Sequence, residues 1–278
     1  MEWLNVVAGP LSLAAGILLL LIVLSLFLWA TGKIEGYDPV SEMLERDNAA
    51  LGIRYAFYLI AVVVGLLGIF DRSQGDSGIV DFVQHALFVA LLIHLARYLN
   101  DWLILYEFSN NREVIQEKNI AVAIVEGATY LATAYVIAGS FYDWENGLVN
   151  AIIWFLIGQF LLIALAFLYR VFARGVAAAL DDHNSAVAIS LGAFLLAGGI
   201  VCGAVISGPS RGWQHDFFVI TIYLLCWIGL MALAHFLSEL LTFRSSRLSD
   251  EVTRQRNIAA ALFKAVIFIA VTLGYTHG

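Results

Sequence analysis

Charged residues are scarce in this chain of 278 residues, and their scarcity excludes most classes of protein. Only 13% of the residues are charged and 61% are hydrophobic, and the mean hydropathy is +0.85. Typical soluble domains carry about 25% charged residues, so this composition indicates a membrane protein with the lipid bilayer as its surroundings. The chain also has no run of basic residues, which argues against nucleic acid as a partner.

Cysteine is almost missing, and so are the common catalytic motifs. Cys202 and Cys226 both lie inside apolar runs, so they predict neither a disulfide framework nor a metal cluster. The chain has no P-loop, His-Glu-x-x-His, Gly-x-Ser-x-Gly or Cys-x-x-Cys motif. His85 and Asp81 could supply two metal ligands, but two ligands on one helix make a poor site, and solvated interface residues are the simpler interpretation. We therefore expect no enzyme, no metal and no cofactor.

The chain contains eight long apolar runs separated by short polar segments. Each run is long enough to cross a hydrocarbon core about 30 Å thick, which needs about 20 residues. The first run is too long for the apolar part of a signal peptide, so we expect it to be a permanent span. The sequence thus predicts an all-α integral membrane protein with eight transmembrane helices. The runs cover residues 10–31, 51–70, 80–106, 120–141, 148–171, 186–207, 216–242 and 258–276.

Basic residues are distributed unevenly between the two ends of these spans. Eleven lie in or beside the loops that follow spans 1, 3, 5 and 7, whereas the opposite loops hold only Arg72 and Arg211. Lys and Arg are enriched in cytoplasmic loops, so this asymmetry predicts that both termini lie outside. The eleven residues are Lys33, Arg46, Arg54, Arg112, Lys118, Arg170, Arg174, Arg244, Arg247, Arg254 and Arg256.

A short motif opens every even-numbered span. It reads NAALGI from Asn48, NIAVAI from Asn119, NSAVAI from Asn184 and NIAAAL from Asn257. Asn is a good helix N-cap, and small residues let helices approach closely, so the motif predicts a helix start followed by a packing seam. A small residue also stands eight positions after each Asn. An alternative hypothesis is that the four Asn side chains converge at the inner leaflet and line an entrance for an ion or solute. The small residues are Ala56, Gly127, Gly192 and Ala265.

The chain also repeats at a longer period. When residues 95–124 are shifted by 138 positions, ten of the thirty are identical. Each half holds an even number of spans, so we predict two parallel-repeated four-helix domains, residues 1–142 and 143–278. The motif and its spacing resemble the bacterial domain of unknown function 350, whose usual members are four-helix inner-membrane proteins. The resemblance implies a tandem duplication in the bacterial inner (plasma) membrane, with no known activity and with genes often near those for envelope-stress proteins.

Six ionisable residues lie deep inside predicted spans and correspond between the halves. Arg97, Asp101 and Glu126 match His235, Glu239 and Lys264 at the shift of 138. A charge at bilayer depth costs about 3 kcal/mol or more, so such residues should pair inside the protein. From their depths along the helices, we predict contacts between Arg97 and Glu126 and between Glu239 and Lys264, with His235 one turn from Glu239.

Two functional hypotheses follow from this buried polar interior. The first is a channel or transporter for a small ion, with His94 joining the six residues in a proton or cation relay. The second is a non-transporting membrane partner or scaffold in the envelope stress response, whose ion pairs only fix helix register. Transport predicts a hydrated cavity beside the charges, and a scaffold predicts a dry contact. A homo-oligomer and a different membrane protein are both open as partners.

Overall fold

The computed structural model describes residues 2–70, 79–108, 110–142, 148–173, 175–241 and 247–277. These residues include the eight expected membrane-spanning helices, so the predicted all-α membrane fold is confirmed. Of the residues used in the orientation and metal hypotheses, Arg72, Arg174, Arg244 and the side chain of Asp81 lie outside this description. The long helices are α1 (Glu2–Ile34), α3 (Ala49–Phe70), α4 (Ile79–Leu103), α5 (Ile120–Ser140), α6 (Leu148–Phe172), α8 (Ser185–Ile206), α9 (Trp213–Leu241) and α11 (Ile258–His277).

One three-part pattern of helices occurs four times along the chain. A long outer helix is followed by a short helix and then by a long inner helix, and we call each such triplet a unit. The short helices are α2 (Pro39–Leu44), the π-helix η1 (Arg112–Gln116), α7 (Val176–Asp181) and α10 (Leu248–Thr253). Units 1 to 4 are therefore α1–α2–α3, α4–η1–α5, α6–α7–α8 and α9–α10–α11.

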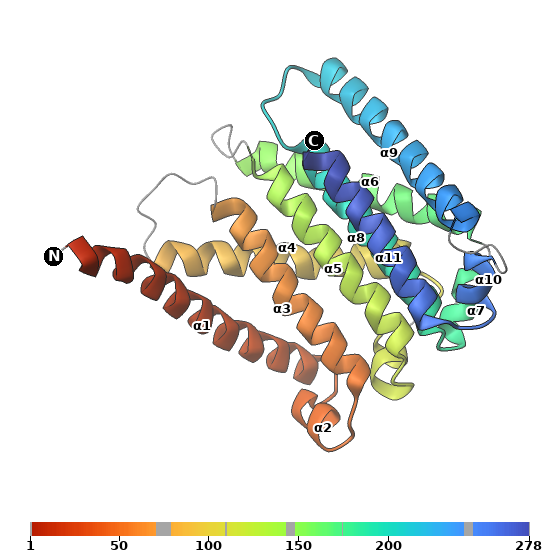
Figure 1. The fold of residues 1–278 in the computed structure, drawn as a ribbon. Helices are drawn as coiled ribbons and strands as arrows, with labels where there is room; N and C mark the ends of the chain where they lie inside the picture. The colour runs from red at the N-terminus through yellow and green to blue at the C-terminus, as the bar shows by residue number, and fades with distance from the viewer. Residues whose placement is uncertain are drawn as a thin grey trace.

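The inner helices α3, α5, α8 and α11 form a continuous row of parallel helices (Figure 1). Each later outer helix packs over the groove between two inner helices: α4 over α3 and α5, α6 over α5 and α8, and α9 over α8 and α11. The middle of the row is the core, because 78% of the α5 span is buried but only 22% of the α11 span. The parallel direction of the repeat agrees with the sequence analysis.

The two halves of the chain meet in a close contact between helices α5 and α8. A Cβ atom on Gly203 of α8 would lie 2.3 Å from the backbone oxygen of Tyr135 in α5. A Cβ on Gly139 of α5 would similarly lie 2.1 Å from the backbone oxygen of Gly203. The halves are therefore joined backbone to backbone within one row. The predicted division between residues 142 and 143 stays a prediction, since residues 143–147 lie outside the described part of the chain.

The repeated Asn residues begin the inner helices, as the sequence predicts. The side-chain oxygen of Asn119 accepts hydrogen bonds from the backbone N–H groups of Ala121 (3.0 Å) and Val122 (3.2 Å), and Asn184 caps α8 in the same way. Such caps are needed because an unsatisfied N–H group in lipid costs several kcal/mol. The residue before each Asn has a left-handed backbone, with φ between 49° and 55°, which non-glycine residues seldom adopt. These residues are Asp47, Lys118, His183 and Arg256.

The contact between α5 and α8 can be tested with a pair of glycine substitutions. Gly203→Val should lower the melting temperature and the yield of monodisperse protein in detergent, because overpacking costs about 1–3 kcal/mol and the opposing atoms are backbone. Gly229→Val is the matched control, since a Cβ atom at Gly229 would meet nothing within 4 Å. Equal melting temperatures for the two variants would contradict the close approach.

Candidate functional site

Three charged side chains from three helices meet inside the first half. Arg54 of α3 donates from Nε to Oε2 of Glu126 in α5 at 2.7 Å, and Arg97 Nε of α4 lies 3.3 Å from Oε1 of the same carboxylate. The hydroxyl of Tyr130 donates to Oε1 at 2.5 Å. The Glu126 side chain has no exposed surface, and that of Arg54 is only 3% exposed. The predicted contact between Arg97 and Glu126 is thus confirmed, and both side chains are buried.

A polar rim completes this charge cluster. Arg97 also lies 3.2 Å from Glu35 and 3.6 Å from Asp101. The side-chain oxygen of Asn111 accepts from both guanidinium groups, at 3.0 Å from Arg54 and 2.8 Å from Arg97. A buried ion pair needs further hydrogen bonds to offset its desolvation, and this rim bonds both guanidinium groups, although Arg97 Nε itself makes no hydrogen bond among the described contacts.

Sequence analysis missed Arg54 and Glu35 as members of the cluster. The charge pattern groups Arg54 with the basic residues at the cytoplasmic ends of the helices. Its position relative to Asn48, however, indicates that it lies deeper. It stands six residues after Asn48, and Glu126 stands seven after Asn119, so the two lie level in adjacent inner helices. Glu35 follows the first span and meets Arg97 across 62 positions of sequence, which no local pattern indicates.

His94 stands apart from the ion pairs of the charge cluster. Its Nε2 atom lies 3.4 Å from the hydroxyl of Tyr98, and its ring packs edge-on against Phe27 at 5.4 Å between centroids. No described hydrogen bond joins His94 to Glu126 or Arg97. The contacts therefore favour a core histidine over a member of a relay.

The repeated Asn side chains tie each unit to the next. The amide nitrogen of Asn48 donates to the carbonyl of Val114 in η1 at 3.0 Å. Asn119 donates to Leu180 of α7 at 2.9 Å, and Asn184 donates to Thr253 of α10 at 3.1 Å. These three side chains are almost completely buried. They lie along a row, and each side chain caps its own helix and donates a hydrogen bond to the next unit. The hypothesis that they line a common entrance is therefore wrong for these three residues.

The fourth member of the row, Asn257, is bonded only within its own unit among the described contacts. Its oxygen caps α11 by accepting from the N–H of Ala260 at 3.1 Å, and its amide donates to Oε2 of Glu251 at 3.1 Å. Asn257 is also more exposed than its three counterparts. No fifth unit follows it along the described chain.

In the second half, the predicted ion pair between Glu239 and Lys264 is wrong as a direct contact. The carboxylate of Glu239 accepts from the backbone N–H groups of Leu248 (2.9 Å) and Ser249 (3.1 Å) at the start of α10. These free helix-start donors satisfy Glu239, whose only described ion pair is with His235 at 3.9 Å. Lys264 Nζ lies instead 5.9 Å and 5.5 Å from the ring centroids of Tyr169 and Phe268.

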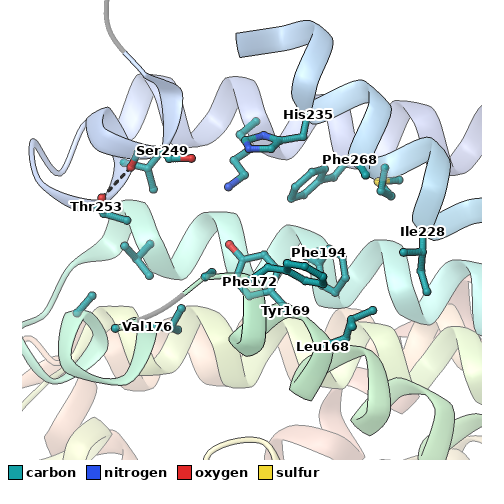
Figure 2. A pocket seen from close by; sticks show the side chains of 18 residues that line it. Leu168, Tyr169, Phe172, Val176, Phe194, Ile228, His235, Ser249, Thr253 and Phe268 are labelled. Atoms are coloured by element: carbon teal, nitrogen blue, oxygen red, sulfur yellow. Dashed lines mark hydrogen bonds between the residues drawn. The ribbon is translucent and has the colours of Figure 1, made fainter.

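Lys264 lines a pocket of about 580 Å³ between α6, α8, α9 and α11. In Figure 2, His235, Ile228 and Phe268 face Tyr169, Phe194 and Leu168 across this space. The short helices α7 and α10 close one end through Val176, Ser249 and Thr253 and their neighbours. Most of the lining is aliphatic or aromatic.

The ionisable groups Lys264 and His235 in this pocket are both basic side chains. Lys264 and His235 both line it, whereas no Asp or Glu is among its described lining residues. Ser249 and Thr253 add hydroxyl groups on the α10 side. The Lys264 ammonium group gains some cation–π energy from the aromatic rings, and no described carboxylate forms a direct ion pair with it. The pocket is therefore suited to a ligand that is apolar along most of its length and anionic at one end.

The charge cluster can be tested by charge reversal. Glu126→Lys should sharply reduce the yield of folded protein in detergent, since it places a third cation beside Arg54 and Arg97 and breaking a buried pair costs about 3–5 kcal/mol. Adding Arg97→Glu should restore part of the yield. Glu117→Lys is the control, because the pair of Glu117 with Arg112 is exposed and such pairs contribute about 0–1 kcal/mol. Absence of any rescue would count against the buried contact.

The comparisons with known proteins agree with the repeat. The model of the family described as Domain of Unknown Function (DUF350) matches residues 3–141 and again residues 143–277. A "UPF0719 transmembrane protein" of Aquifex aeolicus (strain VF5) is 24% identical over 234 residues, covering 82% of this chain and 85% of the relative. No solved structure matches the chain significantly. With both halves matched, the chain belongs to the DUF350 family of multi-pass transmembrane proteins.

Proposed function

We propose that this membrane protein binds an anionic amphiphile, a molecule with one acidic headgroup and an apolar chain, in the pocket of its second half. One observation carries the proposal: Lys264 lines a mainly apolar pocket of about 580 Å³ that has no carboxylate among its described lining residues. Small-molecule sites have volumes of about 300–1,000 Å³, with apolar walls and a few polar groups that fix orientation. The pocket matches both criteria.

The headgroup would lie beside Lys264, which lines the pocket, while the Glu239 carboxylate stays bonded to the backbone N–H groups of Leu248 and Ser249. A carboxylate or phosphate there would supply the counter-ion that Lys264 lacks, and charge-assisted hydrogen bonds are about twice as strong as neutral ones. The apolar chain would run along Ile228, Met231, Phe194 and Phe268. These lining residues offer it no polar side-chain group.

The route of entry is from the bilayer. Phe172, which lines the pocket, is 79% exposed, so this wall reaches the surface of the molecule. The α9 span, which forms the opposite wall, is the least buried of the eight at 17%. An amphiphile already dissolved in the membrane could enter between α6 and α9 without crossing water.

The small-ion hypothesis has less support. A permeation path needs water beside the charges, but the Glu126 carboxylate is completely buried and bonded by protein groups. This buried, protein-bonded carboxylate supports the scaffold interpretation for the first half. The role in the envelope stress response stays a prediction, since no feature of the described chain identifies a partner. We also infer a non-enzymatic role.

We infer that the short helices α2, η1, α7 and α10 lie on the cytoplasmic side of the bacterial inner membrane. Arg46, Arg112, Lys118, Arg254 and Arg256 stand beside these helices, which supports that orientation by the positive-inside rule. Both termini would then be periplasmic.

Ligand binding is tested with purified protein in detergent. Lys264→Gln should weaken binding of radiolabelled palmitate about 10- to 150-fold, because a hydrogen bond to a charged group contributes about 1.5–3 kcal/mol. Arg254→Gln should bind as the wild type does, because Arg254 is an exposed cation outside the pocket. Hexadecyl phosphate distinguishes a phosphate from a carboxylate preference. Equal binding of palmitate and uncharged hexadecanol would overturn the assignment of the headgroup site.

Ion transport is tested separately in liposomes. We expect flux of protons, sodium and potassium to equal that of empty vesicles, because the Glu126 carboxylate at the centre of the charge cluster is completely buried. A flux above that background, abolished by Glu126→Gln in protein that still melts cooperatively, would restore the small-ion hypothesis.

A further inference from the structure

The same join between neighbouring units occurs three times in the chain. At the helix start, the Asn of each of the first three units donates its amide to a carbonyl of the next short helix. Deeper in the membrane, in the first two of these joins, the residue eight positions after one Asn packs against the residue nine positions after the preceding Asn. A Cβ on Gly127 would lie 2.5 Å from Phe57, and a Cβ on Gly192 would lie 3.1 Å from Ala128.

The row of inner helices ends at α11, and we call this its forward end. Here the residues that would form one side of such a join are exposed. The residue nine positions after Asn257 is Val266, which is 65% exposed. The residue two positions after Asn257, Ala259, is exposed as well, although Ala50, Ala121 and Ala186 are buried at the equivalent positions. Unit 4 therefore presents the face that the other units bury against their successors.

The row begins at α3 of unit 1, and we call this its rear end. Here the residues that would form the other side of such a join are exposed. Ala56 stands eight positions after Asn48 and is exposed, whereas its counterparts Gly127 and Gly192 are buried in the joins. The short helix α2 ends at Leu44, which is 80% exposed. By register, Met43 and Leu44 occupy the positions of the carbonyl groups that accept the Asn amide in the three internal joins. No described hydrogen bond reaches their own carbonyl oxygens.

We propose that the forward face of unit 4 docks on the rear face of unit 1 in a second copy of this chain. Val266 and Ala259 of α11 would pack against α3 of the second copy, at the level of Ala56. The amide of Asn257 would donate to the carbonyl of Met43 or Leu44 in that copy. The contact would thus be the fourth instance of a join that the chain already makes three times.

Lipid is a poorer occupant of these two faces. Lipid tails cover any apolar surface equally well, so exposed Val and Leu residues alone do not select a protein partner. A small residue at Ala56 gives no packing advantage against lipid. The Asn257 amide, which donates one hydrogen bond to Glu251, has a second N–H that lipid tails cannot bond. The join uses both features. Because the two faces differ, the contact is head-to-tail, and it either closes into a ring or continues as a longer row.

Cysteine cross-linking between two differently tagged chains tests this contact. Both chains carry Cys226→Ser, which removes the exposed native thiol and leaves the buried Cys202. One chain carries Val266→Cys and the other Ala56→Cys, and the two are co-expressed and oxidised in membranes. The expected product carries both tags and has twice the 30.5 kDa mass of the chain. A disulfide forms only when the two Cα atoms come within about 7 Å, so the product reports the register directly.

Three controls make the result decisive. Either variant expressed alone should give no dimer, and a strong dimer from one alone would indicate a symmetric contact and overturn the proposal. Phe236→Cys on the exposed face of α9 should not cross-link to Ala56→Cys. Lack of the mixed product, when both thiols react with maleimide in folded protein, would also overturn it.

The Asn257 amide is tested in the same assay. Asn257→Ser keeps an oxygen that can cap α11 and removes the amide donor. It should leave the melting temperature near that of the parent and reduce the mixed cross-link. An unchanged cross-link would remove Asn257 from the proposed contact. Palmitate binding serves as an independent readout, since the pocket lies within units 3 and 4 and should be unaffected.

Discussion

The Asn that opens each inner helix is the interaction on which the rest of this structure depends. A helix that starts near the hydrocarbon must bond its first N–H groups, and the Asn oxygen does so in all four units. In three units the amide of the same side chain also bonds a carbonyl of the next unit. One residue therefore sets both where the helix begins and where its neighbour lies. With that register fixed, glycine and alanine can face each other, and the helices can pack at backbone distance.

The two halves share this backbone arrangement but differ in what surrounds the ionisable residue of the second inner helix. In the first half, Glu126 lies between two arginines and a tyrosine hydroxyl, and no surface of its side chain is exposed. In the second half, the corresponding Lys264 faces aromatic rings across an open volume of about 580 Å³. Duplication preserved the backbone arrangement, which depends on small residues and Asn. It left the charged positions free to diverge, because they contribute little to the close contacts between inner helices.

Sequence patterns were sufficient for the elements of this fold but not for all of its contacts. Apolar run length predicts the eight spans, and the Asn motif predicts the helix starts, because both depend on local physics. Depth along the helices predicts the contact of Arg97 with Glu126. The same reasoning fails for Glu239, because α10 begins beside it and offers two free N–H groups that a depth count cannot reveal. Glu35 reaches Arg97 across 62 positions, and the pocket depends on how far α6 and α9 stand apart. Both are tertiary features without a local signature.

The unit, and not the half, explains why Lys264 lacks a counter-ion. In the second unit, the position seven residues after the Asn meets the position six residues after the Asn of the preceding unit, as Glu126 meets Arg54. For Lys264 that preceding position is Ser190, whose buried hydroxyl has no hydrogen-bond partner among the described residues. A serine cannot neutralise an ammonium group, and the nearest acid, Glu239, is already bonded to α10. By register, Lys264 thus stands where Glu126 forms its ion pair, and the position that holds Arg54 in the first half holds a serine here. An acidic group from outside the chain would complete the pair, which is the physical basis for assigning an anionic ligand to this pocket.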